Sequence, residues 1–230
     1  MKLEILFEDN HCLVVNKPAG LLSQADVTGD PSVVSWAKDD LKARYLKPGN
    51  VYVGLVHRLD RPTSGVVLLA RTGKAASRLS AQFRAGQIAK VYWAIVEGEP
   101  ADDHGEWIDL LEKDPQSNLV RVKAAEQPDD GGKEARVVYR VVARCAGVSK
   151  LELRPATGRS HQLRVQLANR GMPIVGDRKY RAATVLKAVD GGHRIALHAR
   201  QLSFKHPTRE EVISVVAPVP ADWPGSWPGV

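Results

Sequence analysis

The chain has 230 residues and a formal net charge of +7, because 33 Lys and Arg residues outnumber 26 Asp and Glu residues. Hydrophobic residues make up 43% and charged residues 26%, which excludes disordered, collagenous and fibrous classes and leaves a globular protein with a sizeable core. The basic excess is compatible with a polyanionic partner such as nucleic acid, and equally with a surface whose charge only keeps the protein in solution.

Cysteine and histidine usage argues against metal sites and disulfides. Cys12 and Cys145 are far apart in the sequence, and the seven histidines form neither an HExxH motif nor a Cys/His cluster. The segment Met1–Asp9 carries acids within its apolar stretch, unlike a signal peptide. Apolar runs such as Val66–Ala70 are far shorter than the roughly 20 residues of a membrane span. We therefore expect a cytoplasmic protein that does not bind a membrane.

Short apolar runs alternate with turn signals along the whole chain, which is typical of strands. They predict strands at Leu3–Phe7, Cys12–Val15, Val51–Val56, Val66–Ala70, Val91–Val96, Trp107–Leu111, Leu119–Lys123, Ala135–Ala143, Lys150–Arg154, Ile195–Phe204 and Glu211–Val216. Because consecutive strands usually pair, these runs favour a sheet that is mainly antiparallel.

Three further segments show helical periodicity: Pro31–Tyr45, Gly73–Ala85 and His161–Arg170. Thr72 is the expected N-cap of the second helix, and Ser160 that of the third. The elements together predict an α+β fold with a large, mainly antiparallel mixed sheet and a few flanking helices. No repeat or low-complexity tract interrupts the chain, and we expect one domain over residues 1–230.

The most unusual segment is His57–Gly65, with the sequence HRLDRPTSG. It places one carboxylate, Asp60, among cations in a loop at the end of a predicted strand, where reactive groups often lie. Nearby positive charge keeps a carboxylate ionised, which suits a nucleophile or a general base. An Asx-type turn with surface ion pairs is the alternative interpretation.

Two other segments combine basic and aromatic residues. In Arg154–Arg164 the turn at Thr157 and Gly158 precedes a predicted helix, and a helix N-terminus near arginines can bind an anion. In Lys90–Ala94 the side chains of Lys90 and Tyr92 share one face of a predicted strand. A tyrosine beside cations can stack on a nucleobase, although a core tyrosine is the more common case.

Four stretches resemble the RluA family of RNA pseudouridine synthases. Val15–Gly20 matches its early Lys-Pro-x-Gly motif, His57–Gly65 its catalytic HRLDxxTSG motif, Lys90–Ala94 its K-x-Y-x-A strand, and Arg154–Tyr180 its long third motif. They occur in the family's order and, with Leu197–Pro207, extend over almost the whole chain. The nine-residue HRLDxxTSG motif is the most specific of them.

Two features depart from many family members. Gln166 stands where the family often has histidine, which leaves the polar contacts at that position open. Lys17 and Pro18 come so early that we expect no N-terminal S4 RNA-binding domain, and RNA binding would then rely on the basic surface of the catalytic domain itself.

The resemblance implies that the protein isomerises uridine to pseudouridine in RNA without a cofactor, since no atom or electron is gained. Asp60 would be the essential carboxylate, as a nucleophile or as a base. Arg164 would pair with Asp60, Tyr92 would pack against the uracil, Leu163 would form an apolar wall, and Arg58 would lie beside the space that the extruded uridine leaves.

Two rival functions remain open from the residues alone. The first is an RNA-binding protein that keeps the fold without catalysis; the second is an enzyme acting on a small nucleoside or glycoside through Asp60, although glycosidases usually need a second acid. The resemblance does not distinguish ribosomal from transfer RNA. Specificity is expected in Leu22–Pro31, Asp102–Gly105 and Lys179–Arg194, and a monomer is the expected state.

Overall fold

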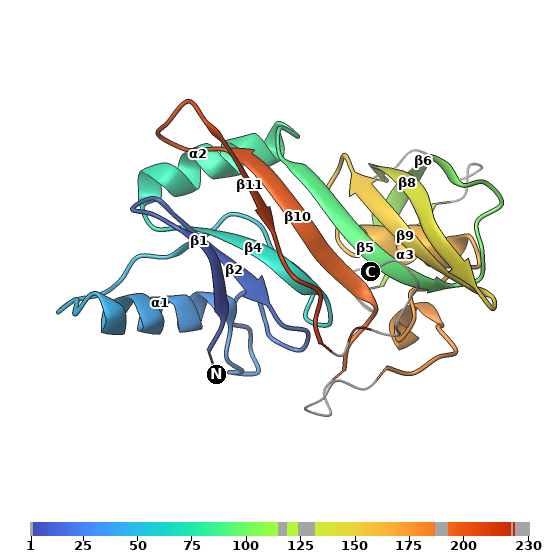
Figure 1. The fold of residues 1–230 in the computed structure, drawn as a ribbon, viewed down its shortest axis with the longest axis horizontal. Helices are drawn as coiled ribbons and strands as arrows, with labels where there is room; N and C mark the ends of the chain where they lie inside the picture. Colours follow the sequence, from blue (N-terminus) through green and yellow to red (C-terminus); the bar gives the residue numbers. More distant parts are fainter. Residues whose placement is uncertain (1, 115–118, 124–131, 187–192, 222, 224–230) are drawn as a thin grey trace. The chain divides into compact units, whose positions relative to one another are not determined.

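The computed structural model describes residues 2–114, 119–123, 132–186, 193–221 and 223. They form two compact units: unit 1 comprises Met1–Ala89 and Ala199–Ala221, and unit 2 comprises Lys90–His198 and the residues from Asp222 onward. Each unit contributes strands to the 11-stranded sheet and has helices of its own (Figure 1). The prediction of one domain over the whole chain stays a prediction.

Unit 1 contains the N-terminal strands and most of the last long strand. Its strands are β1 (Glu4–Glu8), β2 (Cys12–Lys17), β3 (Gly54–Leu55), β4 (Ser64–Ala70), β10 (Leu197–Lys205) and β11 (Val212–Val216). They follow the order β1-β2-β4-β10, with β11 paired to β10 and β3 paired to β4. In the antiparallel β2–β4 ladder, Lys17 at the end of β2 lies opposite Gly65 at the start of β4.

Two helices complete unit 1: α1 (Val33–Arg44) and α2 (Gly73–Arg84). Helix α1 begins two residues later than predicted because Ser32 and Ser35 form a reciprocal capping box. Thr72 caps α2 by accepting a hydrogen bond from the Ala75 N–H at 3.2 Å, as predicted. Helix α2 packs on β4 through a buried cluster that includes Ala75 and Leu79.

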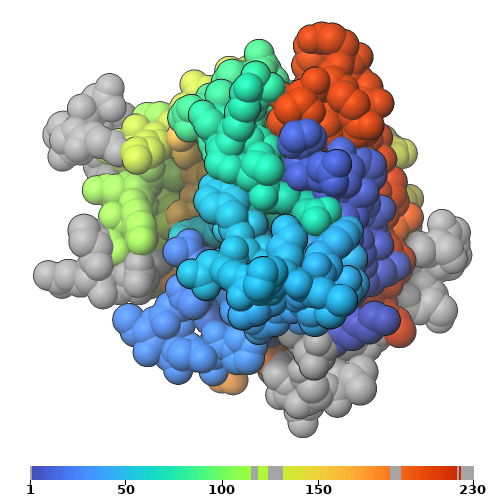
Figure 2. Space-filling model, turned by 90° about the vertical axis from the view of Figure 1, so that its left-hand side faces the viewer, coloured from blue at the N-terminus to red at the C-terminus, as the bar shows by residue number. Residues whose placement is uncertain are grey.

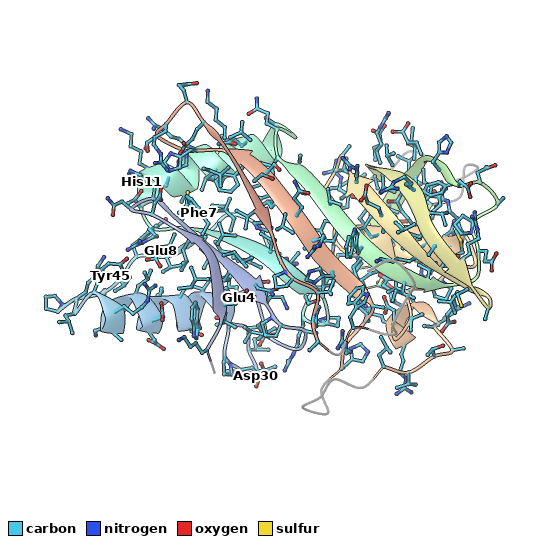
Figure 3. All side chains as sticks on the ribbon, viewed as in Figure 1. Glu4, Phe7, Glu8, His11, Asp30 and Tyr45 are labelled. Atoms are coloured by element: carbon cyan, nitrogen blue, oxygen red, sulfur yellow. The ribbon has the colours of Figure 1, made fainter. Side chains whose placement is uncertain are left out.

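The end of α1 is attached to β1 by polar contacts. The Tyr45 hydroxyl donates to Glu8 Oε1 at 2.8 Å, and Arg44 reaches the other oxygen of Glu8 at 2.9 Å (Figure 3). Hydrogen bonds from Tyr45 and Arg44 lower the pKa of Glu8, although its partial burial acts in the opposite direction. These contacts hold the C-terminal end of α1 against β1.

The turn between β1 and β2 is closed by a second polar cluster, which we call the Asp9 clamp (Asp9, His206 and Arg209). Asp9 Oδ1 accepts from the backbone N–H groups of His11 and Cys12, while Oδ2 accepts from His206 Nε2 at 2.7 Å and Arg209 Nη2 at 2.9 Å. In Figure 2 the dark-blue N-terminal strands and the orange-red segment between β10 and β11 accordingly lie together.

Unit 2 contains five strands and one α-helix among its described residues. They are β5 (Ala89–Glu97), β6 (His104–Lys113), β7 (Val120–Val122), β8 (Lys133–Cys145), β9 (Val148–Pro155) and α3 (Gln162–Asn169), followed by the 3-10 helix η1 (Arg178–Tyr180). The strand order is β5-β9-β8-β6-β7, and all four ladders between these strands are antiparallel. The core of the unit lies where these strands meet α3, with Leu151, Leu153 and Leu167 fully buried.

The predicted α+β class with mainly antiparallel strands is confirmed, and the differences are local. The predicted strand Val51–Val56 pairs with β4 only through Gly54 and Leu55. Ser160 is not the cap of α3: the N-cap is His161, which has a left-handed φ of 52° and makes no side-chain cap bond. In the described part of the chain, no helix has the length and apolar character needed to cross a membrane.

Candidate active site

The segment His57–Gly65, which we call the Asp60 loop, lies after β3 and includes the first two residues of β4. Its turn is closed by a hydrogen bond from the Thr63 N–H to the Asp60 carbonyl oxygen at 3.0 Å. At its end Gly65 has φ of 117°, and a Cβ there would collide with the backbone of Ala199 on β10. Only glycine fits where the two strands come this close. Gly65 therefore fixes the backbone conformation in which the Asp60 loop continues into β4.

The residues before Asp60 are fixed by side-chain contacts. His57 Nε2 accepts a hydrogen bond from the Leu68 N–H at 2.9 Å, and its ring stacks on Phe83 at 4.6 Å between centroids. Leu59 is held from both sides by the buried Ser23, whose hydroxyl donates to the Leu59 carbonyl and accepts from its N–H. His57, the residue that begins the motif, therefore anchors the Asp60 loop to β4 and α2.

The residue after Asp60 is held by the buried Lys17. Its Nζ donates to the carbonyl oxygens of Pro18, Leu21 and Arg61 at 3.0, 2.8 and 3.1 Å, and the side chain is fully buried. Burial lowers the pKa of Lys17 to about 7, while the nearby Asp60 carboxylate opposes this shift. Lys17 thus joins the Lys-Pro-x-Gly turn to the Asp60 loop and places a cationic group near the Asp60 charge.

The two arginines of the Asp60 loop have different surroundings. Arg61 binds Asp30 Oδ2 at 2.8 Å and donates from Nε to the Gly20 carbonyl at 2.9 Å, so it closes the loop on the preceding turn. Arg58 is exposed, and among the described residues it makes no hydrogen bond or ion pair. Arg58 is therefore exposed to solvent, and its role beside the extruded uridine stays a prediction.

In unit 2, Arg164 on α3 is buried together with Asp177. The guanidinium donates from Nε to Asp177 Oδ2 at 2.6 Å and from Nη2 to Oδ1 at 2.8 Å, with 4% and 0% of the two side chains exposed. The ring of Tyr180 lies 5.1 Å from the guanidinium carbon. The predicted pairing of Arg164 with Asp60 joins residues of different units and stays a prediction.

Tyr92 and Leu163 belong to the same part of unit 2. Leu163 on α3 is buried in the main cluster of the unit, and the half-buried Tyr92 on β5 packs against that cluster. Lys90, two residues before Tyr92, donates from Nζ to the Thr157 carbonyl at 2.9 Å. The strand motif and the start of the third motif are therefore connected directly.

The open question about Gln166 has a structural answer. Its Nε2 donates to Asp109 Oδ2 at 2.7 Å and to the Ala135 carbonyl at 3.2 Å, in a fully buried position. Arg170 contacts both oxygens of the same Asp109 carboxylate. Gln166 thus forms part of a polar link between α3, β6 and β8.

Asp177, Lys17 and Lys90 were not among the predicted site residues. Asp177 had a detectable signal, because it is the only acid in Arg154–Tyr180, a segment with six Lys or Arg residues. A lone carboxylate among so many cations is a natural partner for one of them. The contacts of Lys17 depend on the β2–β4 register, which no sequence pattern specifies.

In the described residues, one group of side chains combines metal-ligand chemistry: Asp9, Cys12 and His206. Both Asp9 oxygens already accept hydrogen bonds in the Asp9 clamp, and Arg209 occupies the same side as His206. Burial and the Asp9 charge raise the pKa of the Cys12 thiol to about 12, which opposes the thiolate form that binds metals. These residues form a structural clamp.

Comparisons with known proteins agree on one family. Residues 11–169 match a family model described as RNA pseudouridylate synthase. A ribosomal large subunit pseudouridine synthase D of Xylella fastidiosa is 38% identical over 96% of this chain, which spans about two thirds (67%) of that relative's length. A dual-specificity RNA pseudouridine synthase RluA of Pasteurella multocida is 38% identical over 94% of this chain and 93% of its own length.

Solved structures agree with the sequence comparisons. A human protein, RNA pseudouridylate synthase domain containing 4, superposes with a TM-score of 0.77 at 26% identity, over 96% of this chain and 90% of its own. The similarity therefore includes both the strand motif of β5 and the loop that carries Asp60.

Proposed function

Because the chain belongs to the RNA pseudouridylate synthase family, we propose that it converts uridine to pseudouridine in RNA through the Asp60 carboxylate. The observation that supports this most directly is the anchoring of the Asp60 loop. Leu59 is held by Ser23, the Asp60 carbonyl by Thr63, and the Arg61 carbonyl by Lys17. A reactive group needs a fixed backbone, and these hydrogen bonds hold the backbone of Asp60 and of the residues directly before and after it.

The reaction exchanges one bond to the sugar for another. The bond between N1 of uracil and C1′ of ribose breaks, the base turns, C5 bonds to C1′, and the proton on C5 is lost while N1 gains one. The result is an isomer, so no oxidant, reductant or cofactor is required. An ionised Asp60 can serve this sequence by attacking the substrate or by removing a sugar proton.

The remaining residues of the proposed site have separate tasks. Tyr92 and Leu163 provide apolar surface against the uracil, and the exposed Arg58 contacts the RNA at the position that the extruded nucleotide leaves. Arg164, held by Asp177, orients the Asp60 carboxylate. Extrusion costs a few kcal/mol and is easiest in loops, which favours structured RNA with unpaired uridines.

We place the substrate among ribosomal or transfer RNAs, because similar proteins are named for the ribosomal large subunit or for dual specificity. Acting on such RNA requires access to it, which supports a cytoplasmic enzyme. A monomer is proposed, with RNA held by basic residues of the chain itself. The proposed specificity segments are Leu22–Pro31, Asp102–Gly105 and Lys179–Arg194, of which residues 187–192 lie outside the described part of the structure.

The deciding experiment compares wild type with Asp60→Asn on RNA from a strain that lacks the gene. Mass spectrometry of nuclease digests should show pseudouridine restored by the wild type, and a rate at least about a thousandfold lower for the variant. Asp39→Asn, which changes an exposed acid on α1, is the matched control and should be fully active. RNA binding by Asp60→Asn should persist, because the carboxylate is not an RNA-binding cation.

Two results would contradict the proposal. Normal product formation by Asp60→Asn would remove the carboxylate from the reaction. Conversion of free uridine as fast as uridine in a stem-loop would instead indicate a small-molecule enzyme.

A further inference from the structure

Lys90 is a half-buried lysine for which the described structure shows no acidic partner. It stands at the start of β5, and its Nζ donates once, to the Thr157 carbonyl oxygen at 2.9 Å. An ammonium group has three N–H donors, so up to two remain for another acceptor. Burial lowers the pKa of Lys90 to about 8, and no neighbouring charge contributes to that shift.

The hydrogen bond to Thr157 does not explain why a charged residue stands at position 90, because other hydrogen bonds already hold the turn at residues 157–159. The Thr157 hydroxyl accepts from the Arg136 N–H at 3.0 Å and donates to Gln162 Oε1 at 2.7 Å. Gln162 also accepts from the Arg159 N–H at 3.1 Å and donates to the Arg136 carbonyl at 3.1 Å. A neutral residue at position 90 would leave this network intact.

The space around the lysine is open on the side of the turn. Gly158 has no side chain, and a Cβ built there would have only Lys90 Nζ within 4 Å, at 3.9 Å. Gly158, Arg159 and Ser160 are exposed, so Lys90 lies beside an exposed turn that also carries the cation Arg159, whose Nε donates to the Glu134 carbonyl oxygen at 2.9 Å. Such a position suits an anion from solution.

Strand β5 carries both Lys90 and Tyr92, so it fixes the distance from Lys90 to the proposed position of the uracil. Side chains two residues apart on a strand share a face and lie about 7 Å apart, so Lys90 and Tyr92 face the same way. If Tyr92 packs against the base of the target nucleotide, the separation of Lys90 from Tyr92 is close to the distance between a nucleobase and the backbone phosphate of the same nucleotide. Lys90 would then lie near that phosphate.

We propose that Lys90 binds a backbone phosphate of the RNA next to the target uridine. The proposal rests on the proposed function, because it takes the RNA ligand and the role of Tyr92 from it. The phosphate supplies a negative charge that no described residue places beside this lysine, and it favours the protonated ammonium group. The contact would position the nucleotide from its backbone while Tyr92 positions the base.

The test measures RNA binding separately from turnover. Proteins carrying Asp60→Asn are titrated into a fluorescein-labelled, uridine-containing RNA stem-loop at several KCl concentrations. Lys90→Gln is the informative variant, because glutamine can still donate to the Thr157 carbonyl but carries no charge. Lys90→Arg keeps the charge, and Lys113→Met removes an exposed lysine from β6 as the control.

We expect Lys90→Gln to weaken binding about tenfold and to reduce the slope of log affinity against log salt by about 0.7 to 1. Lys90→Arg should retain the wild-type slope. If the contact with Thr157 were the only role of Lys90, Lys90→Gln would bind like wild type with an unchanged slope, and the phosphate proposal would be overturned.

Failure of the proposed function gives a different pattern. A wild-type protein that binds the RNA with a Lys90-dependent slope but never forms pseudouridine would refute the enzymatic proposal and retain the phosphate contact. A wild-type protein that forms pseudouridine, with a slope that Lys90→Gln does not change, would refute only the phosphate contact. Circular dichroism and thermal unfolding verify that each variant folds.

Discussion

Unit 1 compensates its buried Lys17 with three backbone carbonyls, whereas unit 2 compensates its buried Arg164 with the carboxylate of Asp177. Carbonyl dipoles offset only part of the cost of burying a charge, so the pKa of Lys17 falls to about 7. A guanidinium stays protonated at any physiological pH, and its planar fork matches a carboxylate with two parallel hydrogen bonds.

These two ways of compensating a buried cation predict different responses to pH and to mutation in the two units. The cation of unit 1 can lose its proton near neutral pH, so the anchoring of the Asp60 loop depends on conditions. The ion pair of unit 2 has a fixed charge, and loss of either partner removes the opposite charge that compensates the burial of the other.

Breaking the unit 2 ion pair should have the largest effect on stability. Asp177→Asn removes the carboxylate that binds the buried Arg164 guanidinium through two hydrogen bonds, and we expect the free energy of unfolding to fall by about 3–5 kcal/mol. Urea unfolding measures this loss. Asp109→Asn, which removes a carboxylate from the more exposed Arg170, should cost clearly less.

The same variant tests the positioning of Arg164. Under conditions where Asp177→Asn is folded, kcat should fall while the affinity for RNA changes little, since Asp177 is fully buried and cannot contact RNA. A stability loss below about 1 kcal/mol would contradict the view that the pair is mutually dependent.

Removing the unit 1 cation should have an intermediate effect. Lys17→Met leaves the carbonyls of Pro18, Leu21 and Arg61 without their shared donor, and we expect a loss of about 1–3 kcal/mol together with lower turnover. Urea unfolding at pH 7 and single-turnover kinetics measure the two effects.

The pH dependence of wild type and Lys17→Met sharpens this prediction. The pKa of Lys17 is about 7 in the folded state and ordinarily 10.5, so between these values the unfolded chain binds more protons than the folded one. The contribution of Lys17 therefore makes the free energy of unfolding rise with pH in this window, and Lys17→Met should lack that rise. Identical pH profiles for the two proteins would show that Lys17 does not titrate there.

The smallest effect is expected at the Asp9 clamp, where unit 1 uses a carboxylate. Burial raises the pKa of Asp9, but hydrogen bonds from the backbone of His11 and Cys12 and from His206 outweigh this and lower it below 3.8. Its stabilisation is therefore present above the unfolded pKa and is lost as pH falls through the lower folded pKa.

Asp9→Asn should reduce the free energy of unfolding by about 1–2 kcal/mol at pH 7 and make the protein less sensitive to pH below 4. Thermal unfolding between pH 3 and pH 7 follows both quantities. Equal losses for Asp9→Asn and Asp177→Asn would contradict the distinction between a partly exposed clamp and a fully buried ion pair.

Much of the fold, and the importance of the Asp60 loop, could be predicted from the sequence because both follow from the pattern of residue types. A continuous apolar run marks β4, whose residues are all buried, and apolar residues mark β5, because one or both faces of these strands must be buried. The start of α3 was predicted wrongly, because His161 takes a left-handed conformation that its residue type does not announce. The contact of Lys17 with Arg61 joins residues 44 apart and depends on the β2–β4 register, which local patterns do not encode, whereas the Asp177 partner of Arg164, 13 residues away, could have been found as the lone acid among cations.

The approach of Gly65 to Ala199 has a consequence for synthesis of the chain on the ribosome. Unit 1 is built from two segments, and all of Lys90–His198 is translated between them. The strand that receives Gly65 is thus synthesised after Lys90–His198, the longer segment of unit 2, has had the opportunity to begin folding. A nascent chain truncated before Ala199 would carry every residue of the Asp60 loop and still lack the backbone against which that loop takes its shape.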